Sequence, residues 1–66
     1  MANKDCFIHA YLAFQSARKE CIKNGDSRVL KQAEDYISQM EDLAYYAFGE
    51  RVIYNEKYNS CEFAKV

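Results

Sequence analysis

One stretch constrains the fold more than any other, the segment from Ser27 to Phe48. Within it, apolar residues recur every three or four positions, and the residues between them are polar or charged. The apolar set is Val29, Leu30, Ala33, Tyr36, Ile37, Met40, Leu43 and Ala44. Residues three and four apart lie on one face of an α-helix. The pattern therefore predicts a one-sided amphipathic helix over residues 27–48, terminated by Gly49.

A second helix is expected before it, over residues 4–24. Asn3 is a favourable N-cap, and Gly25 can adopt the left-handed conformation that ends many helices. Because the connection between the two helices is short, they should lie antiparallel as a helical hairpin. The apolar stripe of this helix comprises Cys6, Phe7, Ala10, Ala13, Phe14, Ala17 and Cys21. Ile8 and Leu12 lie off that stripe, so the helix has a second apolar face that needs another cover.

The segment after Gly49 is ambiguous. It is too apolar for a free tail, since it contains Val52, Ile53, Tyr54, Tyr58 and Phe63. Residues 50–58 could form a short third helix followed by an irregular end, or residues 51–54 could pair as an extended strand with residues 61–66. Short apolar runs do not separate helix from strand. We expect the third helix, and hence an all-α fold in which residues 1–66 form a single small helical domain.

A chain of 66 residues buries only a modest fraction of its surface and often needs a disulfide, a metal or a partner for support. The helical hairpin alone would leave Ile8, Leu12, Tyr45, Tyr46 and Tyr54 largely solvated. A second copy would cover more of this surface, and closed twofold pairing is the commonest arrangement. We therefore expect a homodimeric helical bundle. The alternative is a monomer whose C-terminal segment provides the whole cover.

The three cysteines are widely spaced and form no C-x-x-C motif, which favours a reduced, cytoplasmic setting. Cys6 and His9 share a helical face, and Cys21 or Cys61 could approach them. A structural zinc site needs four ligands, however, and no second pair occurs at ligand spacing. We predict no metal and no cofactor. The apolar run near the N-terminus is short and contains His9, so it is expected to be neither a signal peptide nor a membrane span.

Catalysis is not expected, because the chain has one histidine, no nucleophile motif and no glycine-rich loop. Tyrosine is enriched at binding surfaces. The tyrosines that helix packing explains least are Tyr11, Tyr45, Tyr46, Tyr54 and Tyr58. They predict a non-enzymatic interaction protein that binds and regulates a larger protein partner, for instance as an inhibitor. Bacteriophages encode many small chains of this kind, although no family motif here supports that origin.

The alternative function is anion binding at the hairpin end. Five cations are expected there, because the turn brings the end of the first helix beside the start of the second. They are Arg18, Lys19, Lys23, Arg28 and Lys31. Such a cluster could bind a nucleotide or a nucleic-acid backbone. A net charge of −1 argues for the simpler interpretation, a solvated end balanced by nearby carboxylates.

Overall fold

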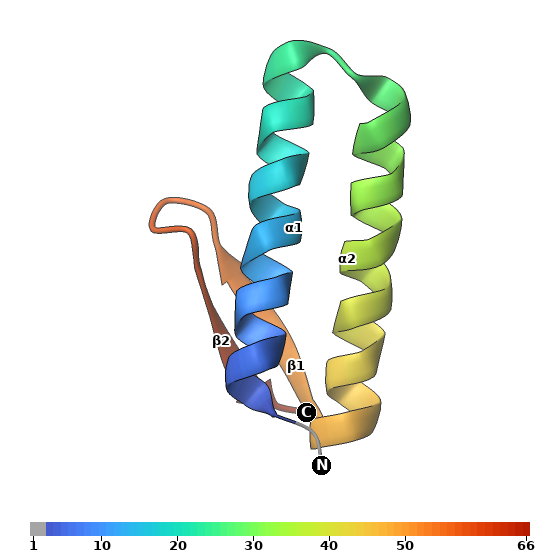
Figure 1. The fold of residues 1–66 in the computed structure, drawn as a ribbon. Coiled ribbons are helices and arrows are strands. Elements are labelled where there is room, and N and C mark those ends of the chain that lie inside the picture. Colours follow the sequence, from blue (N-terminus) through green and yellow to red (C-terminus); the bar gives the residue numbers. More distant parts are fainter. Residues whose placement is uncertain (1–2) are drawn as a thin grey trace.

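The computed structural model describes residues 3–66, which form two helices followed by two strands (Figure 1). Helices α1 (Lys4–Asn24) and α2 (Ser27–Phe48) lie side by side and antiparallel. Strands β1 (Glu50–Asn55) and β2 (Ser60–Lys65) form an antiparallel hairpin against one side of the helical pair. The molecule therefore has two layers, and the second covers only part of the first.

Local capping explains where α1 begins and ends. The side chain of Asn3 accepts hydrogen bonds from the backbone N–H groups of Asp5 and Cys6, which have no partner within the helix. At the other end Gly25 has φ 74°, and its N–H donates to the carbonyl oxygen of Cys21. The predicted bounds 4–24 are confirmed.

The same devices define α2. The carboxylate of Asp26 accepts a hydrogen bond from the N–H of Val29 at 3.2 Å. Gly49 has φ 66°, and its N–H donates to the carbonyl oxygen of Tyr45 at 3.0 Å. The helix spans Ser27–Phe48, as its apolar pattern predicts.

The all-α prediction is wrong at the C-terminus, where residues 50–65 form a β-hairpin instead of a third helix. Burial along β1 alternates with period two, so Val52 and Tyr54 face the helices while Ile53 faces solvent. The register pairs Val52 with Phe63 and Tyr54 with Cys61. The structure thus adopts the strand pairing that the sequence also allowed. Only an extended strand, in which alternate side chains point to the same side, places Val52 and Tyr54 on one face.

A side-chain turn closes the hairpin. The side-chain oxygen of Asn55 accepts hydrogen bonds from the N–H groups of Lys57 and Tyr58, and Asn59 adopts φ 48°. Asparagine tolerates the left-handed region and bonds its own neighbouring backbone, so it suits both positions. The prediction of a third helix over residues 50–58 includes Asn55 and ends just before Asn59, so it does not take these turn-forming properties into account.

The core lies where α1, α2 and the hairpin meet. Its buried residues are Phe7, Tyr11, Ile37 and Ala44. The ring of Phe7 lies 5.9 Å from Tyr11, 5.8 Å from Phe48 and 5.6 Å from Phe63, measured between centroids. Ile8 and Leu12, on the second apolar face of α1, are both half-buried, and Leu12 packs against this core together with Val52, Tyr54 and Phe63 of the hairpin.

Removing one ring of this aromatic group tests the hairpin packing. We expect Phe63→Ala to lower the free energy of unfolding by about 2–3 kcal/mol, since a large apolar side chain in contact with Phe7 and Phe48 is lost. Ile53→Ala, on the exposed side of the same hairpin, should cost less than about 1 kcal/mol. Urea denaturation of both variants measures the difference. Equal losses would contradict this packing.

Candidate interaction surfaces

The five predicted tyrosines do not gather on one surface. Tyr11 is fully buried (0% exposed) and Tyr54 is half-buried against the core. Tyr45, Tyr46 and Tyr58 are exposed, at 50%, 83% and 70% of their surface. Tyr11 is therefore a core residue, and only the last three remain available to a partner.

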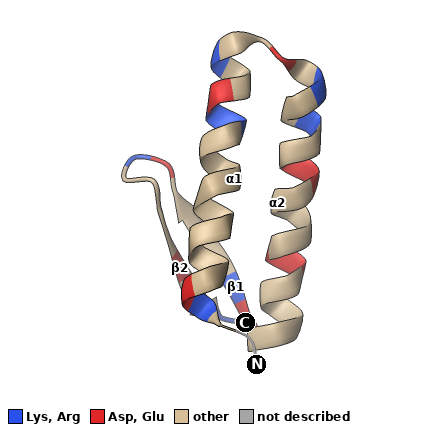
Figure 2. Ribbon diagram, in the orientation of Figure 1, with Lys and Arg blue, Asp and Glu red and all other residues tan. Residues whose placement is uncertain are grey.

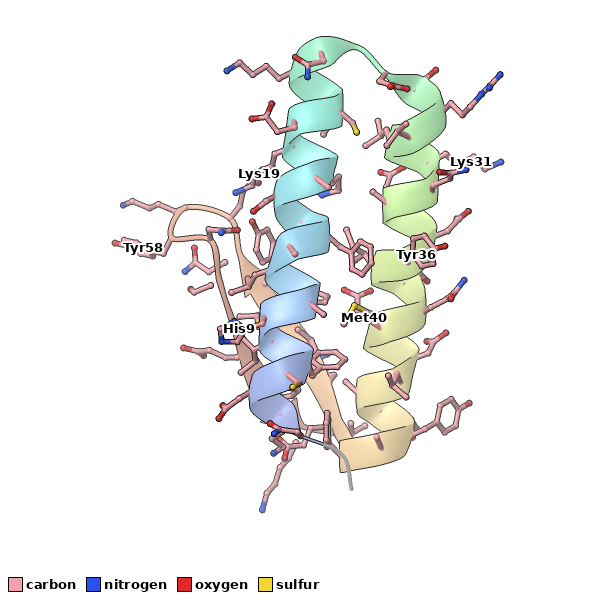
Figure 3. All side chains as sticks on the ribbon, in the orientation of Figure 1. His9, Lys19, Lys31, Tyr36, Met40 and Tyr58 are labelled. Atoms are coloured by element: carbon pink, nitrogen blue, oxygen red, sulfur yellow. The ribbon has the colours of Figure 1, made fainter. Side chains whose placement is uncertain are left out.

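Tyr45 and Tyr46 form a pair at the C-terminal end of α2. Their rings pack edge to face with centroids 5.5 Å apart. Tyr58 belongs to the turn of the β-hairpin, which lies beside the middle of α1 and away from the end of α2 (Figures 1 and 3). The tyrosine pair, meaning Tyr45 and Tyr46, is thus one candidate surface, and Tyr58 stands apart from it.

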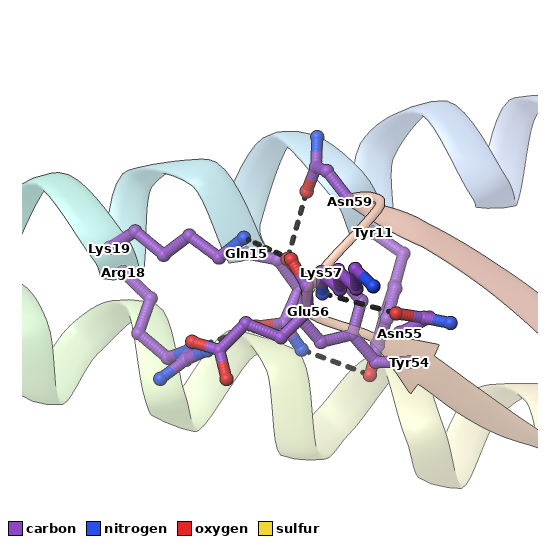
Figure 4. A network of polar contacts seen from close by, with 9 residues as sticks. All are labelled: Tyr11, Gln15, Arg18, Lys19, Tyr54, Asn55, Glu56, Lys57 and Asn59. Carbon is purple, nitrogen blue, oxygen red and sulfur yellow. Dashed lines mark hydrogen bonds and ion pairs between the residues drawn. The ribbon is translucent and has the colours of Figure 1, made fainter.

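A chain of polar contacts runs along α1 on the side of the β-hairpin (Figure 4). The hydroxyl of Tyr11 donates to Oε2 of Glu41 at 2.9 Å and accepts from Nε2 of Gln15 at 3.1 Å. Nε of Arg18 in turn donates to Oε1 of Gln15 at 2.8 Å. Gln15 is the one buried polar residue among those described, and both ends of its amide are satisfied.

The same chain of contacts reaches the hairpin turn (Figure 4). Arg18 lies 3.9 Å from the carboxylate of Glu56, and Nζ of Lys19 donates to the Glu56 carbonyl oxygen at 3.1 Å. Lys19 also lies over the ring of Tyr54, 5.3 Å from its centroid. Two of the five predicted anion-binding cations therefore hold the hairpin against α1.

The other three cations, Lys23, Arg28 and Lys31, are exposed around the turn between the helices (Figure 2). None of them forms an ion pair within residues 3–66. Glu20 and Asp26 carry negative charge in the same region. Anion binding stays a prediction, and it now rests on three solvated cations.

The three cysteines lie in different environments. Cys6 is exposed, Cys21 is buried, and Cys61 is half-buried, where burial raises the pKa of its thiol. Over residues 3–66, His, Cys, Asp and Glu side chains form no group of three or more that could hold a metal ion. Neither described helix is long and apolar enough to cross a membrane.

Sequence reasoning missed the role of Gln15. The signal was present as spacing, because Gln15 follows Tyr11 by four residues and precedes Arg18 by three. That spacing places the three side chains on one helical face. What it could not show was that the β-hairpin and Glu41 close over this face.

No protein-family model, curated protein or solved structure matches this chain.

The raised pKa of the buried Tyr11 hydroxyl can be tested by measuring stability in alkaline solution. Burial raises its pKa from 10.0 to about 12; the hydrogen bond to Glu41 and that residue's charge act in the same direction, while the hydrogen bond from Gln15 acts against it. Above pH 10 the unfolded chain loses this proton while the folded chain retains it. The free energy of unfolding should therefore fall as pH rises from 10 to 12.

In Tyr11→Phe the free energy of unfolding should fall less steeply with pH, because the variant lacks the hydroxyl whose pKa differs between the folded and unfolded chain. At neutral pH the same variant should be less stable by about 1–3 kcal/mol, since it leaves Gln15 and Glu41 without their shared partner. Tyr46→Phe removes an exposed hydroxyl and is the matched control. Urea denaturation from pH 7 to 12 measures both effects. An unchanged slope in Tyr11→Phe would contradict the raised pKa.

Proposed function

We propose that this chain is a non-enzymatic interaction protein that binds and regulates a larger protein through the tyrosine pair. The observation that carries the proposal is the exposure of two adjacent tyrosines at the end of a capped helix. Tyr46 is 83% exposed and Tyr45 is 50% exposed, and their closest aromatic contact is with each other. Tyrosine offers a large contact area at low cost in side-chain entropy.

The position of the pair supports this role. Tyr45 accepts the capping hydrogen bond of Gly49 through its backbone carbonyl, so the backbone that carries both rings is fixed. Asp42, exposed one turn earlier, precedes Tyr45 by three residues and Tyr46 by four. A partner that fits this surface would offer an apolar pocket with a basic side chain beside it.

The mode of regulation follows from what the surface can do. The tyrosine pair and Asp42 provide contact area and one negative charge, and they form no arrangement of nucleophile and base. The chain would therefore act by occupying a surface of its partner, as an inhibitor or an adaptor does. Nucleotide or nucleic-acid binding through Lys23, Arg28 and Lys31 is the alternative, and net charge disfavours it.

Alanine substitution at the pair tests the proposal. We expect Tyr46→Ala to weaken partner binding by more than tenfold, corresponding to loss of a contact worth about 2 kcal/mol. Its circular dichroism spectrum should stay that of the wild type, because the ring is exposed and outside the core. The measurement is capture from host lysate with quantitative mass spectrometry.

Tyr58→Ala is the matched control, since Tyr58 is also highly exposed but belongs to the hairpin turn. The proposal requires a protein that the wild type and Tyr58→Ala both retain and Tyr46→Ala loses. Equal retention by all three proteins would show that the tyrosine pair is not the contact.

A further inference from the structure

The helical pair has one side that the β-hairpin does not cover. On α2, the exposed residues Val29, Tyr36 and Leu43 lie there with half-buried Met40 and with Ala47. On α1 the same side carries Cys6, Ala10, Ala13 and Ala17, all exposed. We call these nine residues the open face. The small-residue stripe of α1, which the sequence assigned to packing within the chain, thus mostly faces outward.

The open face follows the spacing of a coiled-coil seam. Along α2, positions 29, 33, 36, 40, 43 and 47 are separated alternately by four and three residues. Along α1, positions 6, 10, 13 and 17 repeat the same intervals. Apolar residues spaced in this way pack as knobs into holes of a facing helix. Among these positions Ala33 is buried, Met40 is half-buried, and the ring of Tyr36 stacks on Phe14 of α1 while keeping half of its surface exposed. The other positions are exposed, so both seams have surface for a facing helix.

The side chains of the open face also leave two shallow apolar grooves between the helices. One is lined by residues that include Cys6, Met40, Leu43 and Ala47. The other lies nearer the turn and is lined by residues that include Phe14, Ala17, Val29 and Tyr36. Large side chains on α2 and small ones on α1 therefore give a surface with both protrusions and depressions, as interdigitating helices require.

The chain exposes more surface than a compact monomer of its mass, and the excess indicates how much surface a partner could cover. Its accessible surface is 4966 Å², whereas a compact monomer of 7.7 kDa exposes about 4300 Å². Its radius of gyration is 12.1 Å, against about 11 Å for a compact domain of this length. The excess of about 600 Å² is close to the roughly 800 Å² that each partner buries in a standard interface.

We propose that a second copy of this chain covers the open face, giving a four-helix bundle with a β-hairpin on each outer side. Val29, Tyr36 and Leu43 are spaced evenly by seven residues. When two α2 helices pack antiparallel, Tyr36 meets Tyr36 at the twofold axis and Val29 of each copy lies opposite Leu43 of the other. The face is therefore complementary to itself.

Charge favours the orientation that places the two helical turns at opposite ends. Lys23, Arg28 and Lys31 surround the turn, while Glu41 and Asp42 lie in the second half of α2 (Figure 2). Antiparallel α2 helices bring the basic end of each copy beside the acidic half of the other. The reverse orientation would place both basic ends together, where like charges repel.

The mass in solution tests the pairing. We expect light scattering to give twice the chain mass of 7.7 kDa for the wild type, and the single chain mass for Leu43→Glu. Ile22→Glu is the matched control, because Ile22 is exposed to a similar extent, 55% against 53%, on a helix. Ile22 follows Arg18 by four residues and Gln15 by seven, so it lies on the hairpin side. This variant should stay dimeric.

A wild-type mass of 7.7 kDa at millimolar concentration would overturn the proposal. So would a dimer that Leu43→Glu leaves intact, because the interface would then lie elsewhere. The folded state of each variant is checked by circular dichroism. If Leu43→Glu unfolds, Ala13→Glu at the middle of the α1 seam replaces it, with the same expected loss of the dimer.

Distances between spin labels test the orientation. Labels at Lys23→Cys, in a background of Cys6→Ser and Cys61→Ser, should lie about 30 Å or more apart, the length of a 21-residue helix. A separation under about 20 Å would place both turns at the same end and overturn the proposed orientation. The tyrosine pair lies outside both seams, so partner binding through it can fail while the dimer persists.

Discussion

The packing of Phe7 against Phe48 and Phe63 is the contact on which the rest of the structure depends. Each ring comes from a different element, so this one group joins α1, α2 and the β-hairpin. Lys4 completes it by lying over Phe63, 5.0 Å from the ring centroid, while pairing with Glu50 at 2.7 Å. A two-stranded hairpin is at best marginal in water, and this aromatic contact with the helices supplies the surface that stabilises it.

The polar contacts along α1 determine which side chains remain available to a partner. The Tyr11–Gln15–Arg18 chain runs along α1 and bonds Glu41 of α2, and Arg18 and Lys19 contact Glu56 in the hairpin turn. These contacts remove Tyr11 from the candidate partner surface and two cations from the candidate anion site. What remains is the tyrosine pair, the solvated basic turn and the open face of the helices.

The candidate surface was partly predictable from the sequence. Tyr45 and Tyr46 depart from the apolar pattern of α2, and both are indeed exposed. Tyr11 departs from the stripe of α1 in the same way, yet it is fully buried. A departure from the stripe shows only that a residue lies on another face of its helix. Whether that direction leads to solvent depends on where the hairpin packs, which is a contact between residues distant in sequence.

By itself, the sequence determined both helices and the turn between them, because caps and apolar periodicity act over a few residues. It left the segment after Gly49 open between helix and strand, since a short apolar run satisfies either period. Only the tertiary structure decided in favour of strands, by burying Val52, Tyr54 and Phe63 together against α1 and α2. The tertiary structure also decided which side of the helical pair was covered. The hairpin packs on the side of the helices that carries Phe7 and Tyr11, so the stripe of small residues on α1 faces outward.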